Sequence, residues 1–368
     1  MTRIVHILSD GFHAPNARAF IFPVIKHKRA IEAQGVRLRI FSAEDGDLTH
    51  CDNLLVDSRY FSGNIRGASD YIERCLSGWK ENLDSIDWYD TTDSAGRLHG
   101  LVFPYIRRYL KNQILADKSL YLKTLYGRRL FSDYYHREWG IEDNDAEEPD
   151  DNYPQLTDPA DLEKISLSWN SGLSDYSFSS PYRAALFEQF PSLNWFLSYP
   201  SSFTAHDRHR SRSLSCRMST NYRRLSVSVQ RQRVTEAFSE RVPSGRVSRR
   251  QFFRELASSK IVASPFGWGE INYRDYETFL AGAMLFKPDM SHMETWPAFF
   301  ERDITYGSFS WDLSDLMDKL DHYLSDDTLR IRIAQEAQRR YRQFLLGPAA
   351  ADGFAKRFAS LLDPVVSK

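Results

Sequence analysis

The stretch KIVASPFGWGEINYRDYETFLAGAMLFKP, residues 260–288, predicts a strand, a loop, a helix and a second strand. The apolar run 261–263 enters a turn that contains Gly267 and Gly269, and the break at 281–282 precedes the second apolar run. Glycine lets a backbone turn sharply and approach a ligand closely. In open α/β sheets ligands bind at the carboxyl ends of strands, and a helix N-terminus there offers free N–H groups to an anion. The segment therefore predicts a site for a phosphorylated ligand.

The start of the chain has the same alternation of strand and helix. Residues 3–8 are typical of a buried strand, and residues 36–41 alternate as a second one. Between them the pattern predicts a helix that begins near Pro23 and ends at Gly35, because Pro favours the first turn and Gly the position past the end. This β-α-β order opens a doubly wound α/β domain.

The remaining pattern completes two α/β halves. Further strands are expected at 53–56, 86–89, 101–103, 165–169, 214–218 and 304–309, a basic helical stretch at 105–137, an acidic exposed loop at 142–163, and helices from Trp311, Asp327 and Ala349. The composition becomes Arg-rich after Pro200, so we place the boundary between residues 1–205 and 206–368. Two Rossmann-like halves of this size predict a ligand cleft between them.

The overall composition sets the class of protein. The 368 residues carry a net charge of −1 and 42% hydrophobic residues, as an ordinary soluble globular protein does. The cysteines Cys51, Cys75 and Cys216 lie far apart, which favours a reducing compartment over a disulfide framework. The first apolar run is too short for a signal peptide, and no run approaches the ~20 residues of a membrane span. We therefore expect a cytoplasmic protein.

Three charged residues of the opening stretch have the types that bind a nucleotide sugar. Glu270, Arg274 and Glu277 are spaced at four and three, so on a helix they would share one face. A carboxylate accepts from two hydroxyls of a sugar diol, and a guanidinium grips a diphosphate. The alternative is a salt-bridge ladder on a solvated helix.

Residues 257–288 resemble the donor-binding segment of GT-B glycosyltransferases, closest to the group 1 and exostosin-like families. Residues 277–283, ETFLAGA, match the second half of the family pattern, in which a glutamate begins an EAxAxGxP-like helix. The resemblance implies the GT-B fold, two Rossmann-like domains facing a central cleft. It also implies a Leloir-type, hexosyltransferase-like enzyme that takes a nucleotide sugar as co-substrate.

The resemblance carries roles to individual residues of the turn and helix. Glu277 matches the glutamate that holds the nucleotide ribose, and the turn Gly267-Trp268-Gly269 lies where the diphosphate binds. Gly269 occupies the position of the family's first glutamate, and Glu270 follows one residue later. The donor sugar would then be held by Glu270, or by a backbone N–H at Gly269 or Glu270.

Basic residues are needed to neutralise the departing diphosphate, because a metal-free site must stabilise the leaving-group charge. The resemblance points first to Arg217 and more weakly to Lys260; solvated surface arginines are the alternative. Two DxD triplets, at 45–47 and 143–145, fall in short or acidic loops and are read as solvated turns rather than metal ligands. No metal and no other cofactor is expected.

The acceptor side offers three candidates for a general base. Asp10 and His13 follow the first strand, in a loop that faces the cleft of a GT-B arrangement. Asp93, at the exit of the 86–89 strand, is an equal competitor, since Asp or His with a suitable pKa can take the proton of an acceptor hydroxyl. For His13, helix capping or simple surface exposure is the alternative reading.

The expected partners follow from the same half. The basic stretch 105–137 predicts contact with an anionic membrane and a lipid-linked acceptor, against the alternative of a solvated basic face. Residues 169–173 are expected either to line the acceptor pocket or to pack in the core. The Arg-rich block 206–254 does not predict nucleic-acid binding, because the net charge is balanced and no motif is present.

The leading hypothesis is a glycosyltransferase that adds a sugar to a glycan or lipid-linked acceptor of the cell envelope. One alternative is a GT-B-type sugar-nucleotide epimerase, which would isomerise a nucleotide sugar without any acceptor. Another is a non-catalytic carbohydrate-binding protein on the same fold, which would show no nucleotide-dependent stabilisation.

Overall fold

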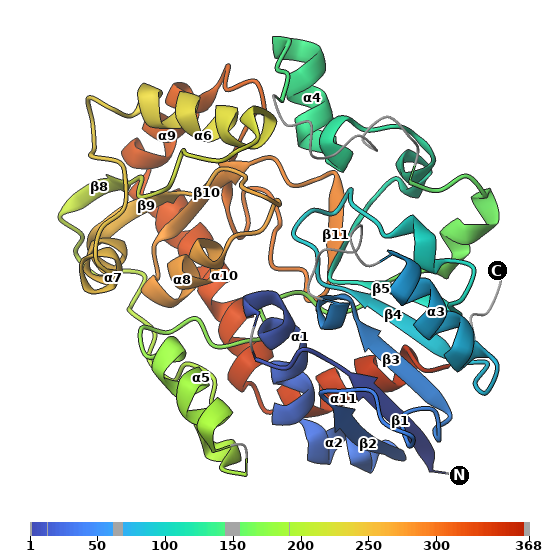
Figure 1. The fold of residues 1–368 in the computed structure, drawn as a ribbon. Helices are drawn as coiled ribbons and strands as arrows, with labels where there is room; N and C mark the ends of the chain where they lie inside the picture. The colour runs from blue at the N-terminus through green and yellow to red at the C-terminus, as the bar shows by residue number, and fades with distance from the viewer. Residues whose placement is uncertain (1, 13, 62–68, 144–154, 191, 364–368) are drawn as a thin grey trace.

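The computed structural model describes residues 2–12, 14–61, 69–143, 155–190 and 192–363. Two parallel sheets lie side by side with helices packed around them (Figure 1). The predicted fold class, two Rossmann-like α/β domains, is confirmed by this architecture. His13, Asp145 and half of the predicted acidic loop lie outside the described residues.

The first sheet has six strands in the order β2-β1-β3-β4-β5-β7, all parallel to their neighbours. The strand bounds are β1 Arg3–Leu8, β2 Val36–Phe41, β3 Asn53–Asp57, β4 Ile86–Asp90, β5 Arg108–Lys111 and β7 Ile165–Leu167. The accompanying helices are α1 Pro15–Lys26, α2 Lys28–Ala33, α3 Ser69–Lys80, α4 Leu130–Trp139 and α5 Ser180–Gln189. Because both faces are covered, β3 and β4 are buried along their whole length.

The second sheet has four parallel strands in the order β12-β10-β9-β8. Its strands are β8 Arg212–Ser215, β9 Ser259–Ala263, β10 Met284–Pro288 and β12 Gly307–Phe309. Its helices are α6 Leu225–Ala237, α7 Arg249–Ser258, α8 Tyr273–Ala281, α9 Leu316–Ser325 and α10 Asp327–Leu346. The predicted order of strand, loop, helix and strand is confirmed as β9, the glycine turn, α8 and β10.

Two features join the halves. Strand β6 (Gln113–Leu115) pairs antiparallel with β11 (Met293–Thr295), so each half contributes one strand to a small sheet. The last helix, α11 (Ala350–Ser360), packs against α2 of the first half. Beyond that helix, the Arg107 and Arg108 guanidinium groups donate to the carbonyls of Leu362 and Leu361. A domain boundary near residue 205 stays a prediction.

Two local predictions were wrong. The first helix begins at Pro15, and Pro23 lies inside it rather than at its start; Pro15 fits the first turn, where the missing N–H costs nothing. Residues 101–103 do not form a strand. Gly100–Val102 is a short 3-10 helix that leads into β5, which is the actual neighbour of β4 in the sheet.

The predicted basic helix at 105–137 is also wrong, whereas membrane contact through this stretch stays a prediction. The stretch contains β5, β6, short 3-10 turns and only one α-helix, α4. Two of its basic side chains turn inward: Lys111 is fully buried and pairs with Asp90 at 2.7 Å, and Arg107 pairs with Asp87, whereas Lys123 and Arg137 are exposed. Among the described residues no helix is long and apolar enough to cross a bilayer.

Candidate functional site

The turn after β9 is where the two halves touch. The N–H of Gly267 donates to the Gly269 carbonyl at 2.9 Å, which closes the turn. A Cβ on Gly269 would lie 1.7 Å from the carbonyl oxygen of Asp93 in the first half. A Cβ on Gly267 would lie 2.6 Å from the Arg231 guanidinium. Glycine is required at position 269 because backbone already occupies the space of a side chain, whereas at position 267 the end of the Arg231 side chain would have to shift.

Gly269→Ala is therefore expected to push the two halves apart and to lower the free energy of unfolding by at least ~2 kcal/mol. Gly46→Ala is the matched control, because nothing lies within 4 Å of its added Cβ. Urea unfolding measures the difference, and small-angle scattering measures the separation of the halves. Equal stability of the two variants would contradict this close contact.

Glu270 lies before α8, and its side chain contacts the first half of the protein. The helix begins only at Tyr273, with Asn272 as its cap, so the prediction that Glu270 shares a helix face with Arg274 and Glu277 is wrong. Its fully buried carboxylate accepts from the Ser94 hydroxyl at 3.1 Å and the Ala95 N–H at 2.9 Å. A donor sugar could reach Glu270 only by displacing these contacts.

His292 sets the charge state of this carboxylate. Burial raises the pKa of Glu270, but the nearby imidazole of His292, 3.6 Å away, and the hydrogen bond from the Ala95 N–H outweigh it and leave the pKa below its usual value. The ionised Glu270 carboxylate, in the glycine turn, thus accepts hydrogen bonds from the loop that follows β4, and these bonds join the loop to the turn.

Lys287 supports the turn from beneath, a role that the sequence analysis missed. Its fully buried amine lies 2.9 Å from Asp275 and donates to the carbonyls of Ser264 at 3.1 Å and Glu270 at 2.9 Å. Burial lowers the pKa of Lys287, and the charge of Asp275 opposes that shift. The available signal was a lone lysine inside an otherwise apolar strand.

Arg231 covers the turn from α6 and was also missed. It donates to the Phe266 carbonyl at 2.5 Å and to the Asn272 side chain at 2.7 Å. Burial, followed by the charge of Arg274, lowers the pKa of Arg231 to about 10. Nothing in the Arg-rich block distinguishes this arginine from its neighbours.

Glu277 and Arg274 lie on α8 with unused hydrogen-bonding capacity. Within the described ranges, the Glu277 carboxylate has no hydrogen bond to protein, and its ion-pair partner is Arg249 at 3.8 Å. Burial raises the pKa of Glu277 to about 7 against the charges of Arg249 and Arg274. The Nε and Nη1 atoms of Arg274 are buried without a partner in the part of the chain that is described. Buried polar groups in this state require a ligand or water.

The other predicted cations are engaged elsewhere. Arg217 pairs with Glu255 at 2.7 Å and donates to the Ser244 carbonyl. Lys260, the second residue of β9, pairs with Asp327 at the end of the strand opposite the glycine turn. Trp268 is partly exposed, and Arg129 donates to its carbonyl at 2.9 Å. Only Arg274 of the predicted cations has unpaired atoms at the turn.

Asp93 is the predicted base that the structure brings to the interface. It lines a small cavity of about 20 Å³, room for about one water molecule, to which both halves contribute. The cavity is bordered by Asn16, Ala19, Phe20, Tyr89, Thr91, Asp93, Asn112, Gln113, Ser171, Ile271 and Tyr273. The Asn16 amide donates to the Asp93 carboxylate at 2.9 Å, and the Tyr273 hydroxyl donates to the Asn16 carbonyl oxygen at 2.7 Å. Asp10 follows β1 and does not line this cavity.

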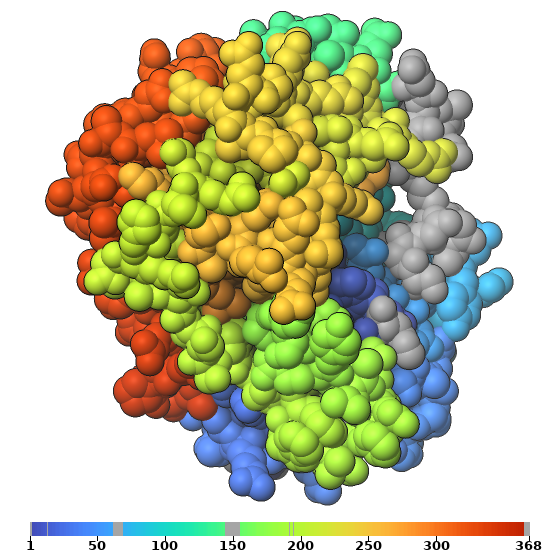
Figure 2. Space-filling view, turned by 90° about the vertical axis from the view of Figure 1, so that its left-hand side faces the viewer, coloured from blue at the N-terminus to red at the C-terminus, as the bar shows by residue number. Residues whose placement is uncertain are grey.

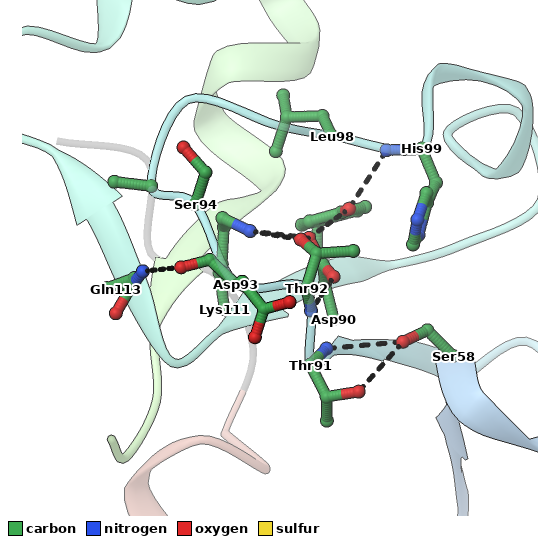
Figure 3. A network of polar contacts seen from close by, with 12 residues as sticks. Ser58, Asp90, Thr91, Thr92, Asp93, Ser94, Leu98, His99, Lys111 and Gln113 are labelled. Carbon is green, nitrogen blue, oxygen red and sulfur yellow. Dashed lines mark hydrogen bonds and ion pairs between the residues drawn. The ribbon is translucent and has the colours of Figure 1, made fainter. Parts of the chain in front are cut away.

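A buried polar network holds the loop that carries Asp93 (Figure 3). Asp90 accepts from the Lys111 amine at 2.7 Å and the Thr92 N–H at 2.7 Å. Burial raises the pKa of Asp90, but the charge of Lys111 outweighs it and keeps the carboxylate ionised. The Gln113 amide donates to the Asp93 carbonyl. The loop is fixed in this way against Gly269.

The two DxD triplets differ in what is described. Asp45 accepts from the Asp47 N–H at 2.8 Å in an exposed turn, which agrees with the solvated turn predicted for residues 45–47. Asp143 accepts from the Ser226 hydroxyl, and Asp145 is not among the described residues. No group of three His, Cys, Asp or Glu side chains in the described ranges is placed to hold a metal. Metal independence stays a prediction.

Trp169 is a core residue. It is buried and stacks on Phe20 at a ring distance of 5.5 Å, in line with the packing alternative. Ser171, two residues on, reaches the interface cavity.

Comparison with known proteins adds one family match. Residues 210–345 match the family described as "Glycosyl transferase-like". The match places a glycosyl transferase-like domain in the second half of the chain, in agreement with the expected class, a glycosyltransferase that uses a nucleotide-activated sugar. No curated protein matches the chain.

Solved structures are similar only at a distance. HepE from Anabaena, in complex with UDP-glucose, has 10% identity, covers 97% of this chain and 100% of its own, and gives a TM-score of 0.45. An α-glucosyltransferase in complex with UDP-glucose and DNA has 8% identity, covers 98% of this chain and 99% of its own, and gives a TM-score of 0.41. A glycosyltransferase from Rickettsia africae has 10% identity, covers 98% of this chain and 98% of its own, and gives a TM-score of 0.43. Likenesses this distant do not transfer a ligand or an activity.

Proposed function

We propose that the protein transfers a sugar from a nucleotide-sugar donor that binds against α8. The observation that carries the proposal is the pair formed by Glu277 and Arg274, a carboxylate without a hydrogen bond and a guanidinium with two buried, unpartnered nitrogens. Both follow a glycine turn at the carboxyl end of β9, where open α/β sheets bind ligands. Among the described residues, no protein group makes a hydrogen bond to the Glu277 carboxylate or to these two nitrogens, and the ion pair of Glu277 with Arg249 is long, at 3.8 Å.

Each residue then has a chemical task. The Glu277 carboxylate accepts hydrogen bonds from the two ribose hydroxyls of the donor. The Arg274 guanidinium lies against the diphosphate and stabilises the charge that grows on it as the glycosidic bond breaks. Arg217 and Lys260 would first have to leave Glu255 and Asp327, so Arg274 replaces them as the principal cation.

The acceptor would bind on the side of the first half. Asp93 is the base that we favour over Asp10 and His13, because its exposed carboxylate lines a cavity between the halves. Side-chain amides and hydroxyls dominate the polar lining and suit the hydroxyls of a glycan or of a lipid-linked sugar, but the two halves must separate to admit one, because the cavity has room for about one water molecule. Contact between the halves excludes water and limits hydrolysis of the donor. A cell-envelope acceptor and a cytoplasmic location belong to the same proposal.

A thermal-shift screen over UDP-, GDP-, dTDP-, ADP- and CMP-compounds tests the donor site. One nucleotide is expected to stabilise the protein by about 2.7 kcal/mol at about 100 times its Kd. Product analysis of the best nucleotide sugar separates the alternatives, because an epimerase would accumulate an isomerised nucleotide sugar without acceptor. Absence of stabilisation by every nucleotide would favour a non-catalytic carbohydrate-binding protein.

A further inference from the structure

A group of large apolar side chains is exposed on and around α5. The most exposed are Tyr182, at 66%, and Trp195, at 69%. The group comprises Phe178, Tyr182, Leu186, Phe190, Leu193 and Trp195. Four of them recur every fourth residue from Phe178 to Phe190, so they follow one stripe of the helix and its flanks. Contiguous exposed apolar surface of this kind marks an interaction site.

The stripe is not a poorly packed core. The opposite side of α5 buries Ala184 and Phe187, and Arg183 ties the helix to Asp175 through an ion pair. The helix is therefore anchored to the protein on one side and apolar on the other. Its remaining charged side chain is the exposed Glu188.

An arginine-rich segment adjoins the stripe. Residues 241–254 contain five arginines and no Asp or Glu, and Arg246, Arg250 and Arg254 are exposed. The two parts are in contact, because Arg249 donates to the Phe178 carbonyl at 3.0 Å and the Phe178 and Phe253 rings lie 5.7 Å apart. Figure 2 shows the green α5 region directly below the gold segment on one face. We call these two parts, residues 178–195 and 241–254, the α5–α7 face.

We propose that the α5–α7 face binds the surface of an anionic phospholipid bilayer. Aromatic and aliphatic side chains on a projecting helix enter the headgroup boundary, where Trp and Tyr are favoured. Neighbouring arginines attract anionic headgroups over a Debye length. An apolar stripe with one exposed acid, Glu188, bordered by the exposed Arg246, Arg250 and Arg254, matches such a bilayer in both polarity and charge.

A second copy of the chain suits this face less well. In a two-fold dimer both subunits present the same patch, so two arginine-rich segments would share one interface. Like charges placed together in this way cost free energy. The bilayer instead supplies the opposite charge. The inference does not depend on the proposed sugar transfer, because its exposed residues lie outside the candidate site; only Arg249, the partner of Glu277, belongs to both.

Co-sedimentation with phosphatidylcholine vesicles, with and without phosphatidylglycerol, tests the bilayer. We expect binding to the anionic vesicles only. Tyr182→Ala/Trp195→Ala is expected to weaken it at least about tenfold, and Arg246→Glu/Arg250→Glu at least about fivefold for each arginine. Leu346→Ala/Ile304→Ala and Arg332→Glu/Arg342→Glu, which replace exposed residues outside the face, are the matched controls and should bind as the wild type does.

Every variant must unfold at the wild-type temperature, so that lost binding is not lost folding. Absence of wild-type binding at low ionic strength overturns the proposal. Binding that the arginine variant loses and the aromatic variant keeps also overturns it, since only unspecific charge attraction would remain. A solution dimer that Tyr182→Ala/Trp195→Ala dissociates would assign the face to a second copy. Nucleotide stabilisation, measured on the same variants, should not change in any of them.

Discussion

Lys287→Met is expected to lower the free energy of unfolding by about 3–5 kcal/mol, because the variant leaves the Asp275 carboxylate buried without its cation. The amine is fully buried, 2.9 Å from Asp275, and it also satisfies the carbonyls of Ser264 and Glu270. Methionine fills nearly the same volume, so the loss reports the charge and hydrogen bonds rather than a cavity. Urea unfolding of the purified variant gives the value.

A surface pair of the same length is the control. Lys356 lies 2.9 Å from Asp352 on α11, but both side chains are more than half exposed. Lys356→Met should change stability by less than about 0.5 kcal/mol, because exposed pairs contribute little. Lys287→Met/Asp275→Asn removes both buried charges and should recover part of the loss. If Lys287→Met cost no more than Lys356→Met, the buried pair would not support the glycine turn as we describe.

Glu277→Ala is expected to weaken binding of the best nucleotide by about 10- to 100-fold, the effect of losing hydrogen bonds to a charged group. Calorimetric titration measures the change in Kd. Glu236→Ala, an exposed glutamate on α6, is the control and should bind as the wild type does. Unchanged affinity in Glu277→Ala would remove the ribose contact from the proposal.

The pH dependence gives a second measure of the same residue. The pKa of Glu277 is raised to about 7, so the carboxyl is largely protonated below that pH and ionised above it. Only the ionised form accepts from both ribose hydroxyls, so affinity should rise as pH increases from about 6 to about 8. Glu277→Gln should abolish that rise. The raised pKa also means that this group's contribution to stability falls as pH rises from its unfolded value to about 7.

The strands could be predicted because their apolar runs are local. The β9–α8–β10 order was read correctly from one continuous segment, with the caps and the small-residue break inside it. The stretch 105–137 could not be read in this way, because its charges alone suggest solvent. Asp87 and Asp90, on the preceding strand, neutralise Arg107 and Lys111, and only the sheet order brings them together.

The site was predictable to the same extent. Glu277 and Arg274 could be found from their spacing after a glycine turn, and the structure leaves both with free polar capacity. Glu270 could not be assigned from sequence, because its partner Ser94 lies 176 residues away. The sequence pattern also predicted that Glu270 lies in the helix, whereas in the structure α8 begins after it, at Tyr273, with a capping box at Asn272. The supporting roles of Lys287 and Arg231 depend on burial, which neighbouring residues in the chain do not specify.

The path of α11 bears on how the protein is made. The first half receives Phe354 and Phe358 against Trp169, and carbonyls just past that helix satisfy Arg107 and Arg108. During synthesis this half leaves the ribosome before the second half, yet the groups that complete it are translated after the sheet of the second half. It must wait, with an uncovered apolar surface, until the second half has emerged. The two halves are thus consecutive in the gene but finish folding together.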